Sequence, residues 1–108
     1  NGRNLDNCKA WTYVDYTAGS EKTINVDVSS WDECLIVVGV NGTDDTNRRV
    51  LASTVISRDM FAIGYSYQSG GRHQACYNGT YQGGINFVSK NQIKLFATPS
   101  ALTRLYYR

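Results

Sequence analysis

The sequence is poor in the residues that usually carry enzyme chemistry, and it lacks long apolar runs. Its 108 residues include one histidine, one proline and one methionine. No run of about 18 apolar residues occurs, so we expect no insertion into a membrane. The patterns GxGxxG, GxxxxGK[ST], HExxH and GxSxG, which mark nucleotide sites, zinc proteases and hydrolases, are absent. These absences predict a protein that is not an enzyme and that uses no metal and no cofactor.

Charge of either sign is also scarce. The chain has 11 lysines and arginines against 9 acidic residues, which gives a formal net charge of +2. The basic residues are spread out, and Arg48-Arg49 is the only adjacent pair. This balance does not favour nucleic acid or an anionic membrane as a partner. With 42% hydrophobic and 19% charged residues, the composition is that of one globular domain.

Cysteine is represented by Cys8, Cys34 and Cys76. An odd number requires at least one free thiol or an intermolecular bridge. No two of them form a CxxC pair, and a site built of cysteine alone would lack zinc ligands. We expect small apolar residues in or near the core, with one intramolecular disulfide as the alternative.

Short segments with period-two alternation recur along the chain, and none has a convincing helical period. Residues 22–28 place Ile24, Val26 and Val28 on one face. Residues 34–40 are apolar on both faces, which predicts a central strand covered from both sides. Further strands are predicted at 9–16, 49–57, 61–67, 72–78, 84–89, 92–98 and 102–108.

The segments between the predicted strands are rich in Gly, Asn, Asp and Ser, which favour turns. A tight hairpin is predicted through Lys90-Asn91. One strand per roughly 8–12 residues is typical of an all-β sandwich or barrel. We therefore predict an antiparallel, jelly-roll-like β-sandwich of about eight or nine short strands, in one domain over residues 1–108. Residues 1–8 are polar and are predicted to be a loop or the remnant of a linker from a longer chain.

Catalytic pairs are poorly supported by the residues present. His73 and Cys76 are three positions apart, which places them on opposite faces of a strand. Glycoside hydrolysis needs two carboxylates. Glu33 is the last glutamate, and only Asp59 follows Asp45 among the aspartates. The supply of candidate acids is therefore small, and no catalytic residue is predicted.

Residues 64–84, GYSYQSGGRHQACYNGTYQGG, combine tyrosines with glycine, serine, asparagine and glutamine. Such mixtures are typical of adaptable recognition surfaces, because tyrosine supplies rigid area and the small polar residues supply hydrogen bonds. The same mixture suits carbohydrate, whose rings have apolar faces and many hydroxyls. The alternative is a tyrosine-rich sheet with ordinary loops. The candidate ligand-binding residues are Tyr65, Tyr67, Arg72, His73, Tyr77, Asn78 and Tyr81.

The last predicted strand, LTRLYYR, has two unlike faces. Thr103, Leu105 and Tyr107 suit a core, whereas the opposite face is amphipathic and requires cover or a partner. Tyr and Arg dominate the cores of protein interfaces. The candidate subunit contacts are Arg104, Tyr106 and Arg108.

The stretches WDECLIVVGVNG, RVLASTVISRDMF and GYSYQSGG, with the terminal LYYR, together resemble a pattern in bacteriophage and prophage structural proteins. In that family a small β-domain closes the chain of a tail fibre, baseplate appendage or head fibre. The resemblance covers roughly residues 29–108 and includes no catalytic signature. At Cys34 the pattern more usually has a plain aliphatic residue.

The resemblance implies a domain at the C-terminal end of a fibre-type chain, located in the virion and often homotrimeric. Its implied role is to attach to a saccharide or protein of the host surface, to cap and trimerise the fibre, or both. The alternative is a carbohydrate-binding module or lectin-like domain of a secreted bacterial protein. That class would be marked by a planar row of Trp or Tyr on one sheet face. A small secreted hydrolase is a third reading.

Overall fold

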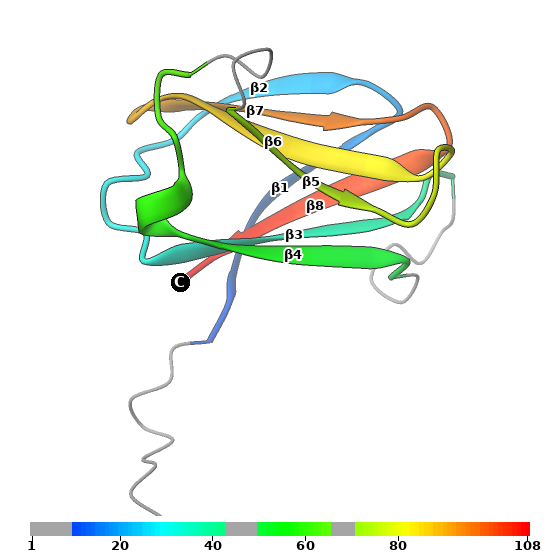
Figure 1. The fold of residues 1–108 in the computed structure, drawn as a ribbon, viewed down its shortest axis with the longest axis horizontal. Coiled ribbons are helices and arrows are strands. Elements are labelled where there is room, and N and C mark those ends of the chain that lie inside the picture. Colours follow the sequence, from blue (N-terminus) through cyan, green and yellow to red (C-terminus); the bar gives the residue numbers. More distant parts are fainter. Residues whose placement is uncertain (1–9, 43–49, 66–70) are drawn as a thin grey trace, which may run out of the picture.

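The computed structural model describes residues 10–42, 50–65 and 71–108, and it has two antiparallel four-stranded sheets packed face to face (Figure 1). The predicted β-sandwich is therefore confirmed, with eight strands. None of the described residues belongs to a helix long and apolar enough to cross a membrane. The elements are β1 (Thr12–Ala18), β2 (Glu21–Asn25), β3 (Glu33–Val40), β4 (Ala52–Ser57), the 3₁₀ turn η2 (Arg58–Met60), β5 (Arg72–Cys76), β6 (Gln82–Ser89), β7 (Gln92–Ala97) and β8 (Ala101–Tyr107).

The strand order joins early and late parts of the chain. Sheet A has the order β1-β8-β3-β4, and sheet B has the order β2-β7-β6-β5. The pairing of β1 with β8 and of β2 with β7 joins segments that are far apart in the sequence. In contrast, β3–β4 and β5–β6–β7 are neighbours in sequence as well as in the sheet. The predicted interior position of residues 34–40 is confirmed, because β3 lies between β8 and β4.

The core lies between the sheets and follows the predicted alternation. Ile36 and Val38 of β3 and Leu105 of β8 are fully buried from sheet A. They meet Ile85 and Phe87 of β6, which are also fully buried. Burial of one such side chain contributes about 1.5–3 kcal/mol. Further buried residues from sheet B are Ile93, Leu95 and Ala97 of β7 and Ala75 of β5.

The two sheets come into close contact at Gly83 and Thr103. A Cβ atom added to Gly83 would overlap the Thr103 hydroxyl and lie 2.8 Å from Cγ2 of Val38. The Thr103 hydroxyl crosses between the sheets and donates to the carbonyl oxygen of Phe96, at 2.9 Å. Thr103 is fully buried, and this bond gives its hydroxyl the hydrogen-bond partner that a buried polar group needs. Gly83 is thus needed for the spacing of the sheets rather than for a turn.

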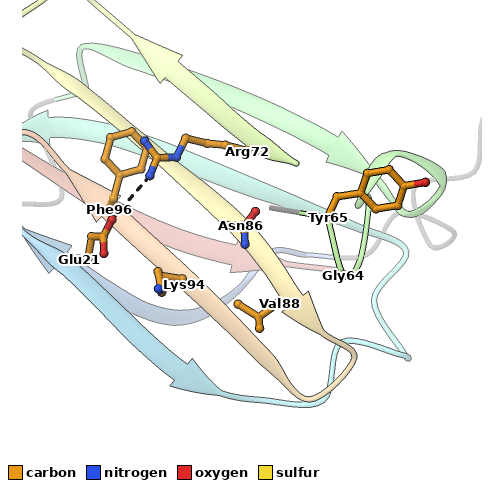
Figure 2. Close-up of a pocket in the computed structure, with 8 residues that line it drawn as sticks. All are labelled: Glu21, Gly64, Tyr65, Arg72, Asn86, Val88, Lys94 and Phe96. Atoms are coloured by element: carbon orange, nitrogen blue, oxygen red, sulfur yellow. Dashed lines mark ion pairs between the residues drawn. The ribbon is translucent and has the colours of Figure 1, made fainter. Parts of the chain in front are cut away.

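The predicted strand over 61–67 is wrong in its described part, residues 61–65. Ala62 and Gly64 have φ angles of +54° and +87°, which an extended strand does not have. Phe61 is buried and stacks on Phe87, with ring centroids 4.2 Å apart. The segment therefore turns over the end of the sandwich and carries Tyr65 toward the outer face of sheet B (Figure 2). Residues 66 and 67 lie outside the described ranges.

Cys34 and Cys76 are both free thiols in different surroundings. Cys34 is fully buried, and this burial, with a smaller effect of Glu33, raises the pKa of its thiol to about 12. Cys76 is exposed, because its side chain points out of sheet B. The expectation of a cysteine in the core is thus confirmed for Cys34 and wrong for Cys76. Cys8 lies outside the described residues.

Candidate functional site

A hollow of about 510 Å³ lies on the outer face of sheet B, and we call it the sheet B groove (Figure 2). Small-molecule sites typically have volumes of about 300–1,000 Å³. All four strands of the sheet and the β4–β5 connection contribute to its walls. The lining residues are Glu21, Gly64, Tyr65, Arg72, Asn86, Val88, Lys94 and Phe96.

The strand register places the polar lining residues on two adjacent rungs of the sheet. On one rung, Asn86 of β6 pairs with Lys94 of β7 on one side and with Arg72 of β5 on the other. On the next rung, Phe96 of β7 lies between Glu21 of β2 and Gly84 of β6. Directly paired residues point to the same face of a sheet. Side chains from four separate segments therefore meet over one surface.

Gly84 makes room for the aromatic ring at the floor of the groove. A Cβ atom on Gly84 would overlap the ring of Phe96 and lie 2.5 Å from the carbonyl oxygen of His73. Glycine inside a strand often marks such a close approach. The ring of Phe96 thus lies across the bare backbone of β6 instead of standing away from the sheet.

Arg72 lies over the exposed side of this arrangement. Its guanidinium carbon is 3.7 Å from the centroid of the Phe96 ring, and one nitrogen lies 3.7 Å from a carboxylate oxygen of Glu21. Cation–π contacts contribute about 0.5–2 kcal/mol, depending on burial. The Glu21 side chain is 57% exposed, so this ion pair contributes little. Of these two contacts, the stack on Phe96 therefore orients the guanidinium more strongly than the ion pair with Glu21.

Asn86 fixes the wall of the groove to its floor. The side-chain amide of Asn86 is assigned the orientation in which both its oxygen and its nitrogen face suitable hydrogen-bond partners. In this orientation the nitrogen donates to the carbonyl oxygens of Tyr65 and Gly71, at 3.1 and 3.0 Å. The backbone N–H of Gly64 also donates to the carbonyl oxygen of Phe87, at 2.9 Å. These bonds hold Tyr65 at the end of the groove opposite Glu21 (Figure 2). The Tyr65 side chain is exposed there.

Lys94 supplies a second positive charge to the groove. Within residues 10–42, 50–65 and 71–108, no hydrogen bond or ion pair engages its amino group. Its side chain lies beside Asn86 in the middle of the groove (Figure 2). The described part of the chain contains no cluster of three or more His, Cys, Asp or Glu that suits a metal ion. The groove therefore offers hydrogen bonds and charge as its means of binding.

The sequence prediction identified two of these lining residues, Tyr65 and Arg72. It missed Glu21, Asn86 and Lys94, together with Phe96 at the floor of the groove. In their strands, polar and apolar residues alternate as in any strand with one solvated face, so the alternation itself does not mark these residues as part of a site. The one local signal for them was the glycine within β6, which indicates a close approach at that point. Tyr67 lies outside the described residues.

His73 faces the interior of the sandwich and not the groove. It pairs with Ile85 and contacts the edge of the Phe87 ring, with centroids 6.2 Å apart. Its Nε2 atom is buried and has no hydrogen-bond partner among the described residues. The side chain therefore lies behind the sheet that carries Arg72.

Tyr77, Asn78 and Tyr81 lie together at the β5–β6 turn. The rings of Tyr77 and Tyr81 meet edge to face, with centroids 6.2 Å apart. The side-chain oxygen of Asn78 accepts from the backbone N–H groups of Thr80 and Tyr81, at 2.8 and 3.1 Å. Asn78 thus shapes the turn. The predicted ligand-binding residues do not form one site in the described structure.

The predicted subunit contacts share the outer face of sheet A but differ in exposure. Arg104 is only 5% exposed, and its guanidinium donates to the hydroxyl of Tyr106 at 3.0 Å. Arg108 forms an ion pair with Glu33 at 2.6 Å and lies over the ring of Trp11, 3.9 Å from its centroid. Both arginines therefore have partners within the chain.

Two further tyrosines on this face of sheet A are open to solvent. Tyr13 and Tyr16 of β1 are 51% and 46% exposed. Tyr13 meets Tyr106 edge to face at an angle of 63°. The rings of Tyr13 and Tyr106 therefore do not lie in one plane. This pair does not form the planar aromatic row that would mark a carbohydrate-binding module.

Comparison with known proteins gives no relatives from which a function can be transferred. No protein-family model matches the chain, and no curated protein and no solved structure matches it.

Proposed function

We propose that this protein is a non-enzymatic attachment domain that binds a saccharide in the sheet B groove. The observation that carries the proposal is the stack of Arg72 on Phe96, surrounded by polar side chains, on the outer face of the sheet. A sugar ring has apolar faces that suit Tyr65 and Val88, and its hydroxyls both donate and accept hydrogen bonds. Arg72 and Lys94 donate such bonds, and the carboxylate of Glu21 accepts them.

The lining of the groove supports binding rather than hydrolysis. Among the described lining residues, Glu21 is the only carboxylate. Glycosidases of the common types place two carboxyl groups on either side of the scissile bond. His73, a potential base, lies on the inner side of the sheet. Binding without turnover is the function that this arrangement supports best.

For the biological setting, we propose attachment of a viral fibre to a host-surface saccharide, as the sequence resemblance implies. A carbohydrate-binding module of a secreted bacterial protein is the second candidate, and it would use the same groove. In the fibre setting we propose a homotrimer in which Tyr13, Tyr16 and Tyr106 on sheet A contact the neighbouring subunits. Light scattering at high protein concentration tests this part, and a strictly monomeric domain would contradict it.

The saccharide proposal is tested by a glycan array probed with three proteins. We expect the wild type to bind and Phe96→Ala to lose at least about tenfold in affinity, which corresponds to roughly 1.4 kcal/mol. Gln74→Ala is the matched control, because Gln74 is exposed on the same face of sheet B outside the groove. Circular dichroism establishes that each variant is folded. If the wild type bound no glycan, or if Gln74→Ala weakened binding as much as Phe96→Ala, the proposal would be wrong.

A further inference from the structure

We infer that the saccharide bound in the sheet B groove is acidic, with a carboxylate or sulfate group held by Lys94 and Arg72. This inference rests on the proposed function of the groove and names the class of its ligand. The chemistry shared by the two acidic groups is a negative charge with several acceptor oxygens, and this chemistry matches the donors of lysine and arginine.

The lining of the groove carries more positive than negative charge. Two cations, Arg72 and Lys94, face one carboxylate, Glu21, among the described lining residues. Glu21 is paired with Arg72, which leaves the charge of Lys94 uncompensated within the groove. The groove therefore has a positive charge in excess. A neutral sugar would leave this charge unmatched, whereas an acidic sugar would compensate it in a partly enclosed site.

The two cations lie on either side of one residue of the sheet. Lys94 and Arg72 pair with Asn86 from opposite sides, so their backbones are two strand spacings apart. This separation is about 10 Å, because neighbouring strands are about 4.8 Å apart. Figure 2 shows Arg72, Lys94 and Asn86 around the same part of the groove. We place the anion between the amino group of Lys94 and the guanidinium of Arg72, which lies over Phe96.

The guanidinium of Arg72 is oriented by the aromatic ring on which it lies. Arg72 uses its flat face for the Phe96 ring, at 3.7 Å. Its N–H donors lie in the plane of the guanidinium and point outward from its edge. The Arg72 side chain is only 21% exposed, so it is held in place before a ligand arrives. A preoriented guanidinium edge recognises planar carboxylates and the oxygens of sulfate with little loss of entropy.

The experiment compares acidic saccharides with their neutralised counterparts. The array contains uronate, sialylated and sulfated glycans beside neutral ones, and each acidic glycan that binds is retested after carboxyl reduction or desulfation. We expect neutralisation to weaken binding by at least about tenfold, and we expect affinity for the acidic form to fall with added salt. The retest also identifies the source of the charge, because carboxyl reduction and desulfation remove different groups.

Three variants assign the effect to the groove. Lys94→Met keeps the length of the side chain and removes its charge, so we expect it to weaken binding of the acidic glycan by about tenfold. Glu21→Gln keeps an acceptor oxygen for a sugar hydroxyl and removes the negative charge that repels an acidic group, so we expect it to strengthen binding of the acidic glycan. Lys90→Met is the matched control, because Lys90 is exposed in the β6–β7 turn outside the groove, and it should leave affinity unchanged.

The possible results separate the two proposals. If the neutralised glycans bound as tightly as the acidic ones, or if Lys94→Met had no effect, the inference of an acidic ligand would be overturned while saccharide binding stood. If the folded wild type bound no glycan of either kind, the proposed function and this inference would both be wrong.

Discussion

Arg72 lies flat on Phe96, with its guanidinium carbon 3.7 Å from the centre of the ring, although the two residues belong to strands that are not adjacent. Strand β6 separates them, and it permits the contact only because Gly84 has no side chain. One glycine thus connects the packing of the sheet to the orientation of a charged group in the groove. The first prediction depends on this contact.

Arg72→Lys retains the positive charge and removes the planar guanidinium. We expect saccharide affinity to fall about threefold to tenfold, because an ammonium group neither stacks in this way nor presents a planar set of donors. Isothermal titration calorimetry with the strongest glycan from the array measures the change. Arg58→Lys is the control, since Arg58 pairs with the exposed Asp32 away from the groove. Equal affinities for Arg72→Lys and the wild type would contradict the role given to the stack.

Gly83→Ala tests the close approach of the two sheets. The added methyl group would overlap the Thr103 hydroxyl, so the sheets must move apart or the bond from Thr103 to Phe96 must break. Overpacking of this kind costs about 1–3 kcal/mol of the free energy of unfolding. Urea denaturation measures the loss. Gly79→Ala is the matched control, since nothing lies within 4 Å of the position of its added atom; a similar loss in both variants would argue against this explanation.

His73→Leu separates the interior from the groove. Its buried Nε2 has no partner among the described residues, and an unsatisfied buried polar atom costs about 1–3 kcal/mol. We therefore expect the leucine variant to be more stable by about 1 kcal/mol in urea denaturation. Saccharide affinity should stay at the wild-type value, because the side chain faces Phe87 on the other side of the sheet. A large loss of affinity with unchanged stability would instead support His73 as a ligand contact.

Much of the fold was predictable because alternation is a local property. Leu105 and Thr103 of β8 lie on the inner face, as their spacing predicted. The prediction failed over residues 61–65, where Phe61, Ile63 and Tyr65 alternate as in a strand. The backbone there bends at Ala62, whose φ of +54° is unusual for alanine and leaves no signal in the sequence. Phe61 is buried as a result, whereas Ile63 and Tyr65 are exposed.

The groove was predictable only in part because it depends on strand register. Tyr65 and Arg72 were found from the recognition-like composition of residues 64–84. Glu21 and Lys94 belong to strands whose polar residues resemble an ordinary solvated face. They come together with Phe96 only through the pairing of β2 with β7 and of β7 with β6, which joins distant parts of the chain. Local patterns do not specify such pairing.

The final prediction concerns the two described thiols. Cys34 is fully buried, and its thiol pKa is raised to about 12, so at neutral pH it is both inaccessible and protonated. The thiolate is the reactive form of cysteine, and Cys76 is exposed.

In a Cys8→Ser background, we expect a maleimide to modify Cys76 in the native protein and both thiols after denaturation, as measured by intact mass. Cys76→Ser should abolish native labelling, whereas rapid native modification of Cys34 would show that the core opens around β3. Raising the pH toward 9 should leave native Cys34 unmodified, because burial keeps its thiol pKa at about 12 and the thiol therefore stays protonated in the folded state.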